Sequence, residues 1–288
     1  MPERVLRPMR ESDLPAVDPI LRAAFAVERD FAPRLHRYLA IEPDGWFVGE
    51  QGGTLLGTVG VVRYPGFAYI GLMAVAPAQQ GRGLGRWLLE HALAWLEQRG
   101  VGCAVLDATE AGAPLYEKLG FVDAGATIEM ARQGDSPPRA VADVTLARVG
   151  PEAADAADLR DLDGRLFGAA RAALWTRLAA EVDPVVPTWL AREAGRALGY
   201  LALQPGLIGP WAATEPRVAE ALLAHALAQV PQGAPLRVQV PDTNVAAVAL
   251  LSARGFAAQR TLRHMRRGDL ARAPVWRDVY GKASYCLG

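Results

Sequence analysis

The sequence predicts an α/β protein of the α+β type, with two copies of one fold that each hold a mostly antiparallel central sheet flanked by helices. The chain has 288 residues, which is longer than one domain usually is. Short apolar runs bounded by turn residues alternate with stretches of helical periodicity. The same order of elements occurs twice, and LLEHALA at 88–94 matches LLAHALA at 222–228.

The N-terminal half opens with a strand at 5–10, after which Ser12 or Asp13 is expected to cap a helix. Residues 31–39 form a second predicted helix. Three apolar runs then follow, and the turn signals Gln51-Gly52-Gly53 and Tyr64-Pro65-Gly66 separate them. They predict an antiparallel meander whose strands cover 46–49, 55–64 and 67–75.

The second part of this half returns to helical spacing at 83–98. CAVLD at 103–107 is typical of a buried strand, a helix is expected at about 113–119, and Phe121 begins the last strands. The predicted order is therefore strand, helices, three strands, helix, strand, helix and strand.

Residues 134–140, GDSPPRA, combine turn formers without an apolar period and are predicted to be a linker. This divides the chain into domains at 1–133 and 141–288. The order of elements starts again in the second domain, with helices expected between 151 and 181, and LLSARGF at 250–256 matches LYEKLGF at 115–121. A second meander follows, with strands at 189–193, 196–203 and 207–213. A helix at 218–230, a strand at 236–240 and a helix at 246–256 come after it.

Lys plus Arg and Asp plus Glu both number 31, so no overall field would attract nucleic acid or an anionic membrane. We expect a small-molecule partner, no nucleic acid and no membrane, and the sequence leaves the oligomeric state open. The first residues lack the apolar core of a signal peptide, which predicts a cytoplasmic protein. The two cysteines are far apart, and the four histidines lack metal-ligand spacing, so neither a disulfide framework nor a metal site is predicted.

VAPAQQGRGLGRWLLEHAL places Gly81, Gly83 and Gly85 directly before a helix. Glycines there leave backbone N–H groups unobstructed at the positive end of the helix, which suits a pyrophosphate. The stretch lacks the strand-first topology and third glycine of a Rossmann fingerprint, and the Gly-Lys-Ser/Thr of a Walker A loop.

With the meander before it and LYEKLGF behind it, this stretch resembles the GNAT superfamily of acyl-CoA-dependent N-acyltransferases, whose signature Q/RxxGxG/A here is Gln80, Gly83 and Gly85. The resemblance implies acetyl-CoA as co-substrate, without a metal. It implies that a strand edge pairs with the pantetheine arm and that backbone amides hold the pyrophosphate. The strand residues are Met73, Ala74 and Val75, and the amides are those of Gln80, Gly81, Arg82, Gly83, Leu84, Gly85 and Arg86.

Tyr116 in LYEKLGF matches the position where many GNAT enzymes place the group that protonates the departing thiolate. A phenol has an ordinary pKa near 10, above about 8.5 for a thiol, and would stay protonated. The alternative is a tyrosine packed in the core with its hydroxyl bonded.

The general base is less defined, because no Asp or Glu lies between Leu55 and Val75. Asp107 and Glu110, in the turn after a buried strand, are the nearest acidic candidates by topology. Turn or helix capping is the interpretation that we favour for Asp107.

The second domain has lost these features, since Arg217 and Ala219 stand where Gly83 and Gly85 stand, and Leu251 replaces Tyr116. The whole pattern resembles a tandem GNAT subgroup of bacterial and animal proteins, which implies one active centre per chain. The predicted function is acetyl transfer to a small-molecule amine. A non-catalytic acetyl-CoA or metabolite sensor and a protein N-acetyltransferase remain alternatives.

Overall fold

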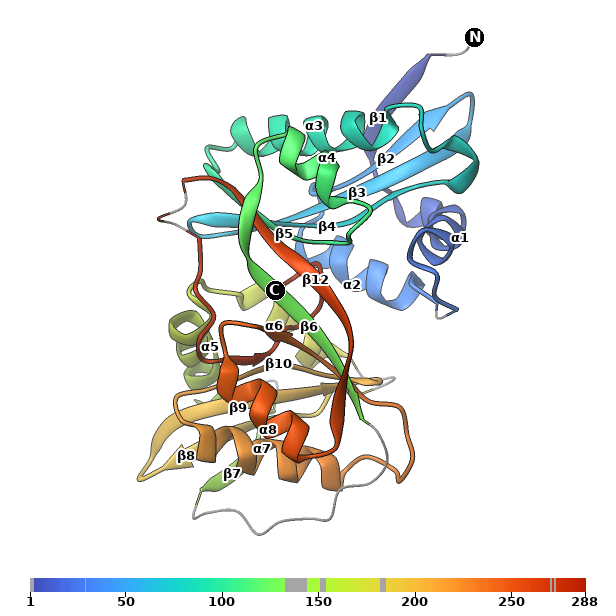
Figure 1. The fold of residues 1–288 in the computed structure, drawn as a ribbon. Coiled ribbons are helices and arrows are strands. Elements are labelled where there is room, and N and C mark those ends of the chain that lie inside the picture. The colour runs from blue at the N-terminus through green and yellow to red at the C-terminus, as the bar shows by residue number, and fades with distance from the viewer. Residues whose placement is uncertain are drawn as a thin grey trace. The chain divides into compact units, whose positions relative to one another are not determined.

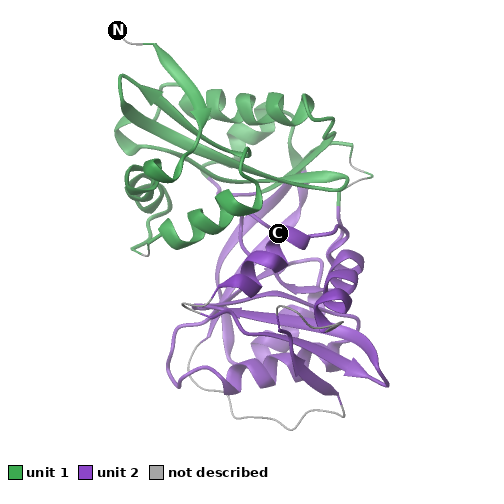
Figure 2. Ribbon diagram, turned by 180° about the vertical axis from the view of Figure 1, so that it is seen from behind, with its two compact units in different colours: residues 1–106, 111–122, 266–273 green, residues 107–110, 123–265, 274–288 purple. Residues whose placement is uncertain are grey.

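The computed structural model describes residues 3–28, 30–132, 144–150, 154–181, 185–269, 271 and 273–288. The chain forms two compact units, shown in Figure 2. Unit 1 comprises Met1–Leu106, Ala111–Val122 and Arg266–Ala273, and unit 2 comprises Asp107–Glu110, Asp123–Met265 and Pro274–Gly288. The predicted linker at 134–140 lies outside the described residues.

The first half of the chain contains the predicted order of elements (Figure 1). Its strands are β1 (Arg4–Pro8), β2 (Trp46–Gln51), β3 (Thr54–Tyr64), β4 (Phe67–Val75), β5 (Cys103–Ala108) and β6 (Val122–Arg132). Its helices are η1 (Glu11–Asp13), α1 (Leu14–Phe25), α2 (Ala32–Ile41), η2 (Pro77–Gln79), α3 (Leu84–Glu97) and α4 (Ala113–Lys118). In unit 1, α3 packs on β3 and β4, and α1 contacts the same strands from the opposite face.

The second half repeats this order. Its strands are β7 (Thr145–Arg148), β8 (Thr188–Glu193), β9 (Arg196–Gln204), β10 (Leu207–Ala213), β11 (Arg237–Pro241), β12 (Phe256–Gly268) and β13 (Val279–Gly281). Its helices are α5 (Ala154–Phe167), α6 (Ala172–Ala180), α7 (Pro216–Ala228) and α8 (Val245–Ala253). The predicted fold class is confirmed, because both halves carry a mostly antiparallel sheet with helices on it.

The strand order explains why the units do not follow the halves of the chain. In unit 1 the order is β1-β2-β3-β4-β5, followed by the end of β12. In unit 2 it is β12-β6-β11-β10-β9-β8-β7, with β6 antiparallel to β11 from Thr127 to Ala131. Each unit therefore takes a strand segment from the other half of the sequence.

Packing of the two copies supports the internal repeat. His91 on α3 meets the ring of Phe47 edge to face at 4.7 Å, and His225 on α7 meets Trp189 in the same way at 5.1 Å. Burial lowers the pKa of His91, so this imidazole is neutral near pH 7. The two equivalent histidines therefore both pack against an aromatic ring of a neighbouring strand.

The predicted cap of the first helix is confirmed in position, since Asp13 is the N-cap residue of α1, but not in its hydrogen bond. Asp13 precedes α1, but its side chain makes no cap hydrogen bond to that helix. The carboxylate instead accepts from the backbone N–H of Arg10 at 2.8 Å and from the Arg7 guanidinium at 2.7 Å. The Arg7 guanidinium binds the carboxylate in place of the helix N–H groups. Its hydrogen bond is the main cause of the lowered pKa of Asp13.

Candidate active site

Strand β4 bends at the point where it leaves its parallel neighbour. The recorded β4–β5 pairs are Ala68 with Ala104 and Tyr69 with Val105, although β4 continues to Val75. Leu72 has φ +46°, and the register with β3 shifts in the same region. This is a β-bulge, which re-aims a strand and its side chains. Met73 thus lies in the bulge with Leu72, and Ala74 and Val75 follow it, all on the part of β4 beyond those pairs.

The glycine loop follows at once and leads into α3. Gly81 and Gly83 both have φ +75°, a conformation that residues with a Cβ rarely adopt. A Cβ at either position would meet no atom within 4 Å, so the space beside the loop is open. Gly85 differs, because a Cβ there would lie 3.2 Å from the Leu115 side chain and 3.9 Å from Met73. It permits close packing of α3.

Most backbone N–H groups of this loop, those of residues 81–86, have no recorded acceptor among the described residues. The Gln80 N–H donates to the carbonyl of Pro77 at 3.3 Å, and the Trp87 N–H donates to Gly83 at 3.1 Å. Between them, within the described chain, the structure records no hydrogen bond from the N–H groups of residues 81–86. Unbonded amides at a helix N-terminus form an anion site. The amide of Gln80 is already engaged, while the amides at 81–86 fit the predicted pyrophosphate role.

The polar side chains of the loop bond locally. The side-chain amide of Gln80 donates to the backbone carbonyl of Val75 at 3.2 Å, which connects the loop to the end of β4. Arg82 donates to Gln79 at 2.8 Å, and Arg86 pairs with Glu90 at 2.7 Å, one turn along α3. Both arginines lie at the surface, where such pairs contribute little to stability.

Tyr116 on α4 lies against β4. Its hydroxyl donates towards Met73 Sδ at 3.8 Å, and its ring meets Phe121 edge to face at 5.8 Å. The residue is 8% exposed, and burial raises the pKa of its phenol above the ordinary value. The phenol therefore stays protonated, and its hydroxyl proton lies beside the bulged part of β4.

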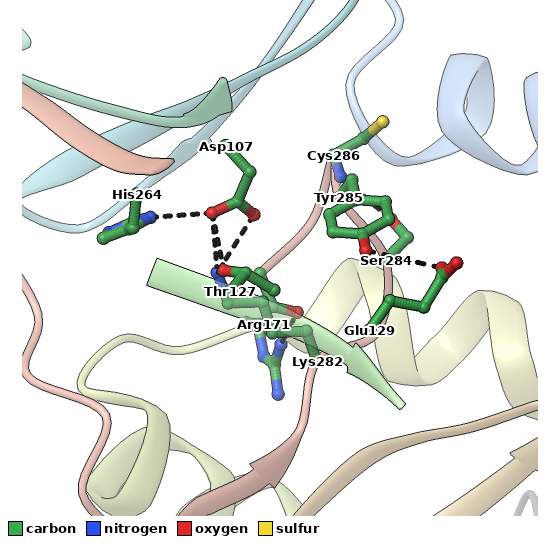
Figure 3. A network of polar contacts seen from close by, with 10 residues as sticks. Asp107, Thr127, Glu129, Arg171, His264, Lys282, Ser284, Tyr285 and Cys286 are labelled. Atoms are coloured by element: carbon green, nitrogen blue, oxygen red, sulfur yellow. Dashed lines mark hydrogen bonds and ion pairs between the residues drawn. The ribbon is translucent and has the colours of Figure 1, made fainter. Parts of the chain in front are cut away.

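Asp107 occupies a buried polar network within unit 2, drawn in Figure 3. Its carboxylate accepts from Lys282 Nζ at 3.0 and 3.1 Å and from the Thr127 hydroxyl at 2.7 Å. His264 Nδ1 lies 3.0 Å from the same carboxylate. The side chain of Asp107 is fully buried, and that of Lys282 is 1% exposed. These contacts form an ion-pair centre, and the residue directly before α4 is Gly112 rather than Asp107.

The protonation states in this network follow from burial and charge. Burial would raise the pKa of Asp107, but the Lys282 ammonium, His264 and Thr127 outweigh it and hold this pKa well below its usual range. Burial lowers the pKa of His264, and the Lys282 charge lowers it further. An ionised Asp107 beside a neutral His264 requires the imidazole to donate from Nδ1. A carboxylate with so low a pKa is a poor proton acceptor at neutral pH.

Sequence reasoning missed Lys282, His264 and Thr127 as partners of Asp107. Lys282 is 175 positions away in the chain, and no short motif links the two. One signal was present, since the chain has only two lysines, Lys118 and Lys282, and Lys282 stands in an apolar segment. A buried lysine requires a buried anion.

The place in unit 2 that matches the glycine loop is acidic. Arg217 at the start of α7 pairs with Glu193 at 2.8 Å and with Glu215 at 2.8 Å. Glu215 is the residue directly before that helix. Two carboxylates at this end of α7 oppose binding of a pyrophosphate.

The described part of the chain contains no group of three or more His, Cys, Asp or Glu residues that could hold a metal ion. Within that same part, every helix is too short or too polar to cross a membrane.

Both halves of the chain match models of acetyltransferase families. The model of the acetyltransferase (GNAT) family matches residues 14–121, and a second model of an acetyltransferase (GNAT) domain matches residues 159–281. An N-acetyltransferase of Bacillus subtilis, YitH, is 30% identical over 220 residues, which cover 74% of this chain and 74% of YitH.

A holothin acyltransferase of Pseudoalteromonas is 25% identical over 237 residues, or 76% of this chain and 74% of that protein. Among solved structures, a candidate acetyltransferase of Pyrococcus horikoshii superposes with a TM-score of 0.85 at 24% identity. The superposition covers 99% of this chain and 96% of that one, so the fold is shared over the full length.

Proposed function

The chain belongs to the GNAT acetyltransferase family, and from this premise we propose that it transfers the acetyl group of acetyl-CoA to the amine of a small molecule, at one active centre per chain. The observation that carries the proposal is the combination in unit 1 of a bulged strand, an open glycine loop and a buried phenol against Met73.

Backbone groups would bind the cofactor. The N–H groups of residues 81–86 would donate to the pyrophosphate, because they precede or begin α3 and the space beside Gly81 and Gly83 is open. Met73, Ala74 and Val75 would pair with the pantetheine amides as an added strand does. A backbone N–H of that stretch would donate to the thioester oxygen as it becomes anionic.

The reaction needs two proton movements. The neutral amine attacks the carbonyl carbon of the thioester, the C–S bond breaks, and the thiolate takes a proton. Tyr116 would supply that proton, because its phenol is protonated at neutral pH and its hydroxyl points to Met73. The amine would lose its proton to water, because Asp107 is held ionised with a depressed pKa. Asp107 therefore accepts no proton in this proposal, and its carboxylate holds the Lys282 ammonium.

The acceptor is tested by following CoA release across a library of small amines, with an N-terminal peptide and a lysine peptide as further arms. The relative named for acylation of holothin, which aligns with 76% of this chain, is the reason to begin with small molecules. Turnover with a small amine supports the proposal. Turnover only with a peptide would make the chain a protein N-acetyltransferase, and acetyl-CoA binding without turnover on any arm would make it a sensor.

A further inference from the structure

Strand β13 lies between two strands of unit 2 that begin as parallel neighbours. The recorded β10–β11 pairs are Leu207 with Arg237 and Ile208 with Val238. Further along, β10 pairs with β13 instead, through Trp211 with Gly281 and Ala212 with Val279. On its other side, the backbone N–H of Lys282 donates to the carbonyl of Gln239 in β11 at 2.8 Å. The segment therefore bonds to both strands.

The matching strands of unit 1 are arranged in a similar way, except that the bulge begins two residues further from the ladder. The β4–β5 ladder also has two recorded pairs, ending at Tyr69, and a bulge follows. Counted from the bulge, Trp211 and Ala212 of β10 correspond to Ala74 and Val75 of β4. The next residue, Ala213, donates its N–H to the carbonyl of Asp278 at 3.1 Å. The segment that contains β13 thus lies along the residues that follow the bulge, which in unit 1 are Ala74 and Val75.

The fit around this segment is close. A Cβ at Gly281 would lie 3.0 Å from the carbonyl oxygen of Ile208 and 3.1 Å from Val238, so the neighbours would have to shift. A Cβ at Gly209 would lie only 2.2 Å from the carbonyl oxygen of Lys282. Glycine is the residue that allows two backbones to approach in this way.

Side chains of unit 2 also donate hydrogen bonds to backbone carbonyls of this segment. Asn244 donates to the carbonyl of Val279 at 3.1 Å, and Gln204 donates to that of Ala283 at 3.0 Å. The Lys282 ammonium, carried by the same segment, pairs with the buried Asp107. Without this segment, a fully buried carboxylate would lose its cation, which is strongly unfavourable.

We propose that unit 2 contains a slot for an extended peptide between β10 and β11, and that the chain's own residues 278–283 are its permanent ligand. This inference rests on the proposed function in one respect: the segment occupies the place that corresponds to the pantetheine arm of unit 1. Unit 2 therefore takes up no acyl-CoA, because its slot is filled. The slot serves instead to deliver Lys282 to Asp107.

The chain's two lysines make the test direct in the full-length protein. An amine-reactive reagent is added under native conditions, and the labelling rates of Lys118 and Lys282 are compared by peptide mass spectrometry. Lys118 is exposed and serves as the internal reference. We expect Lys282 to react at least roughly 100-fold more slowly, because it reacts only from an opened state.

The variants Gly281→Ala and Gly281→Val enlarge the side chain in two steps at the tight contact with Ile208 and Val238. They should raise the labelling rate of Lys282 by roughly 10-fold and 100-fold, because overpacking destabilises the closed state. Amide exchange at Ala213 should increase in parallel, because its acceptor Asp278 leaves with the segment. Gly164→Val is the matched control, since a Cβ at Gly164 meets open space.

Equal labelling of the two lysines in the wild type would overturn the proposal, and so would Gly281 variants that leave Lys282 and Ala213 protected. Neither measurement involves acetyl-CoA. A protein with a protected Lys282 that fails to bind acetyl-CoA would therefore refute the proposed function and leave the filled slot standing.

Discussion

At the scale of single residues, burial decides which groups can exchange protons. Tyr116 and Asp107 are both buried, yet their surroundings act in opposite directions. Burial keeps the Tyr116 phenol neutral, so it retains a proton to donate. Three partners keep Asp107 ionised although it is buried, so it holds Lys282 rather than accepting protons.

Replacing Tyr116 with Phe should lower kcat by roughly 10- to 10,000-fold and change acetyl-CoA affinity little, as expected for loss of a general acid. Steady-state kinetics and equilibrium binding measure the two quantities. Tyr280→Phe is the control, because Tyr280 is a buried tyrosine of unit 2 whose pKa burial raises to about 12. An unchanged kcat in Tyr116→Phe, with chemistry limiting turnover, would leave Tyr116 a packing residue.

Lys282→Met should lower the free energy of unfolding by about 3–5 kcal/mol at pH 7.5, because it leaves the Asp107 carboxylate buried without its cation. This loss of unfolding free energy should become smaller as the pH is lowered towards 5. Without Lys282, burial raises the pKa of Asp107, so the folded state binds a proton more readily than the unfolded state and gains stability as pH falls.

Urea unfolding at the two pH values measures this effect. Lys118→Met controls for removal of an exposed lysine, and Asp107→Asn/Lys282→Met should recover part of the loss, because the buried charge is absent. A deficit of the same size at both pH values would show that Asp107 does not gain a proton.

At the scale of elements, the glycine loop joins the bulged β4 to the start of α3. Apolar periodicity predicts these elements well, because it reports which face of each is buried. It does not report the bulge at Leu72 or the partner of Asp107, which depend on tertiary pairing. Strand β13 was missed because three residues are too few to carry a period.

Gly83→Ala should weaken acetyl-CoA binding by roughly 10- to 100-fold, since the methyl group would stand where the amides face a charged acceptor. The matched control is Gly53→Ala in the β2–β3 turn, where φ is +79° and a Cβ also meets open space. Both variants should lose about 1–2 kcal/mol of stability from left-handed strain. Titration calorimetry measures the acetyl-CoA affinity of each variant. Equal affinities of the two variants would show that the pyrophosphate binds elsewhere.

At the scale of the whole molecule, the repeat in the sequence and the compact units are different divisions. The repeat predicts two copies of a fold, and the structure shows two copies of the element order. Which strand completes which sheet is set by pairing over long separations, and no local pattern contains it. As a result, Arg266–Ala273 belong to unit 1 and Asp123–Met130 to unit 2.

A fragment of residues 1–133 should therefore fail to fold as unit 1. It lacks Arg267, which donates to the carbonyl of Leu119 at 2.8 Å, and Asp269, whose N–H donates to Gly102 at 2.9 Å. It also leaves β6 without β11, so an unpaired strand edge is exposed and promotes association. Size-exclusion chromatography and thermal melting should show a self-associating fragment without a cooperative transition.

The control is the full-length chain with a protease site inserted at 134–140 and cleaved after folding. Both pieces should then remain in one complex and keep acetyl-CoA binding, because every strand retains its partner although the connection is cut. The comparison isolates the exchanged segments from the linker itself. A monomeric 1–133 fragment that melts cooperatively and binds acetyl-CoA like the full chain would show that the end of β12 is dispensable to unit 1.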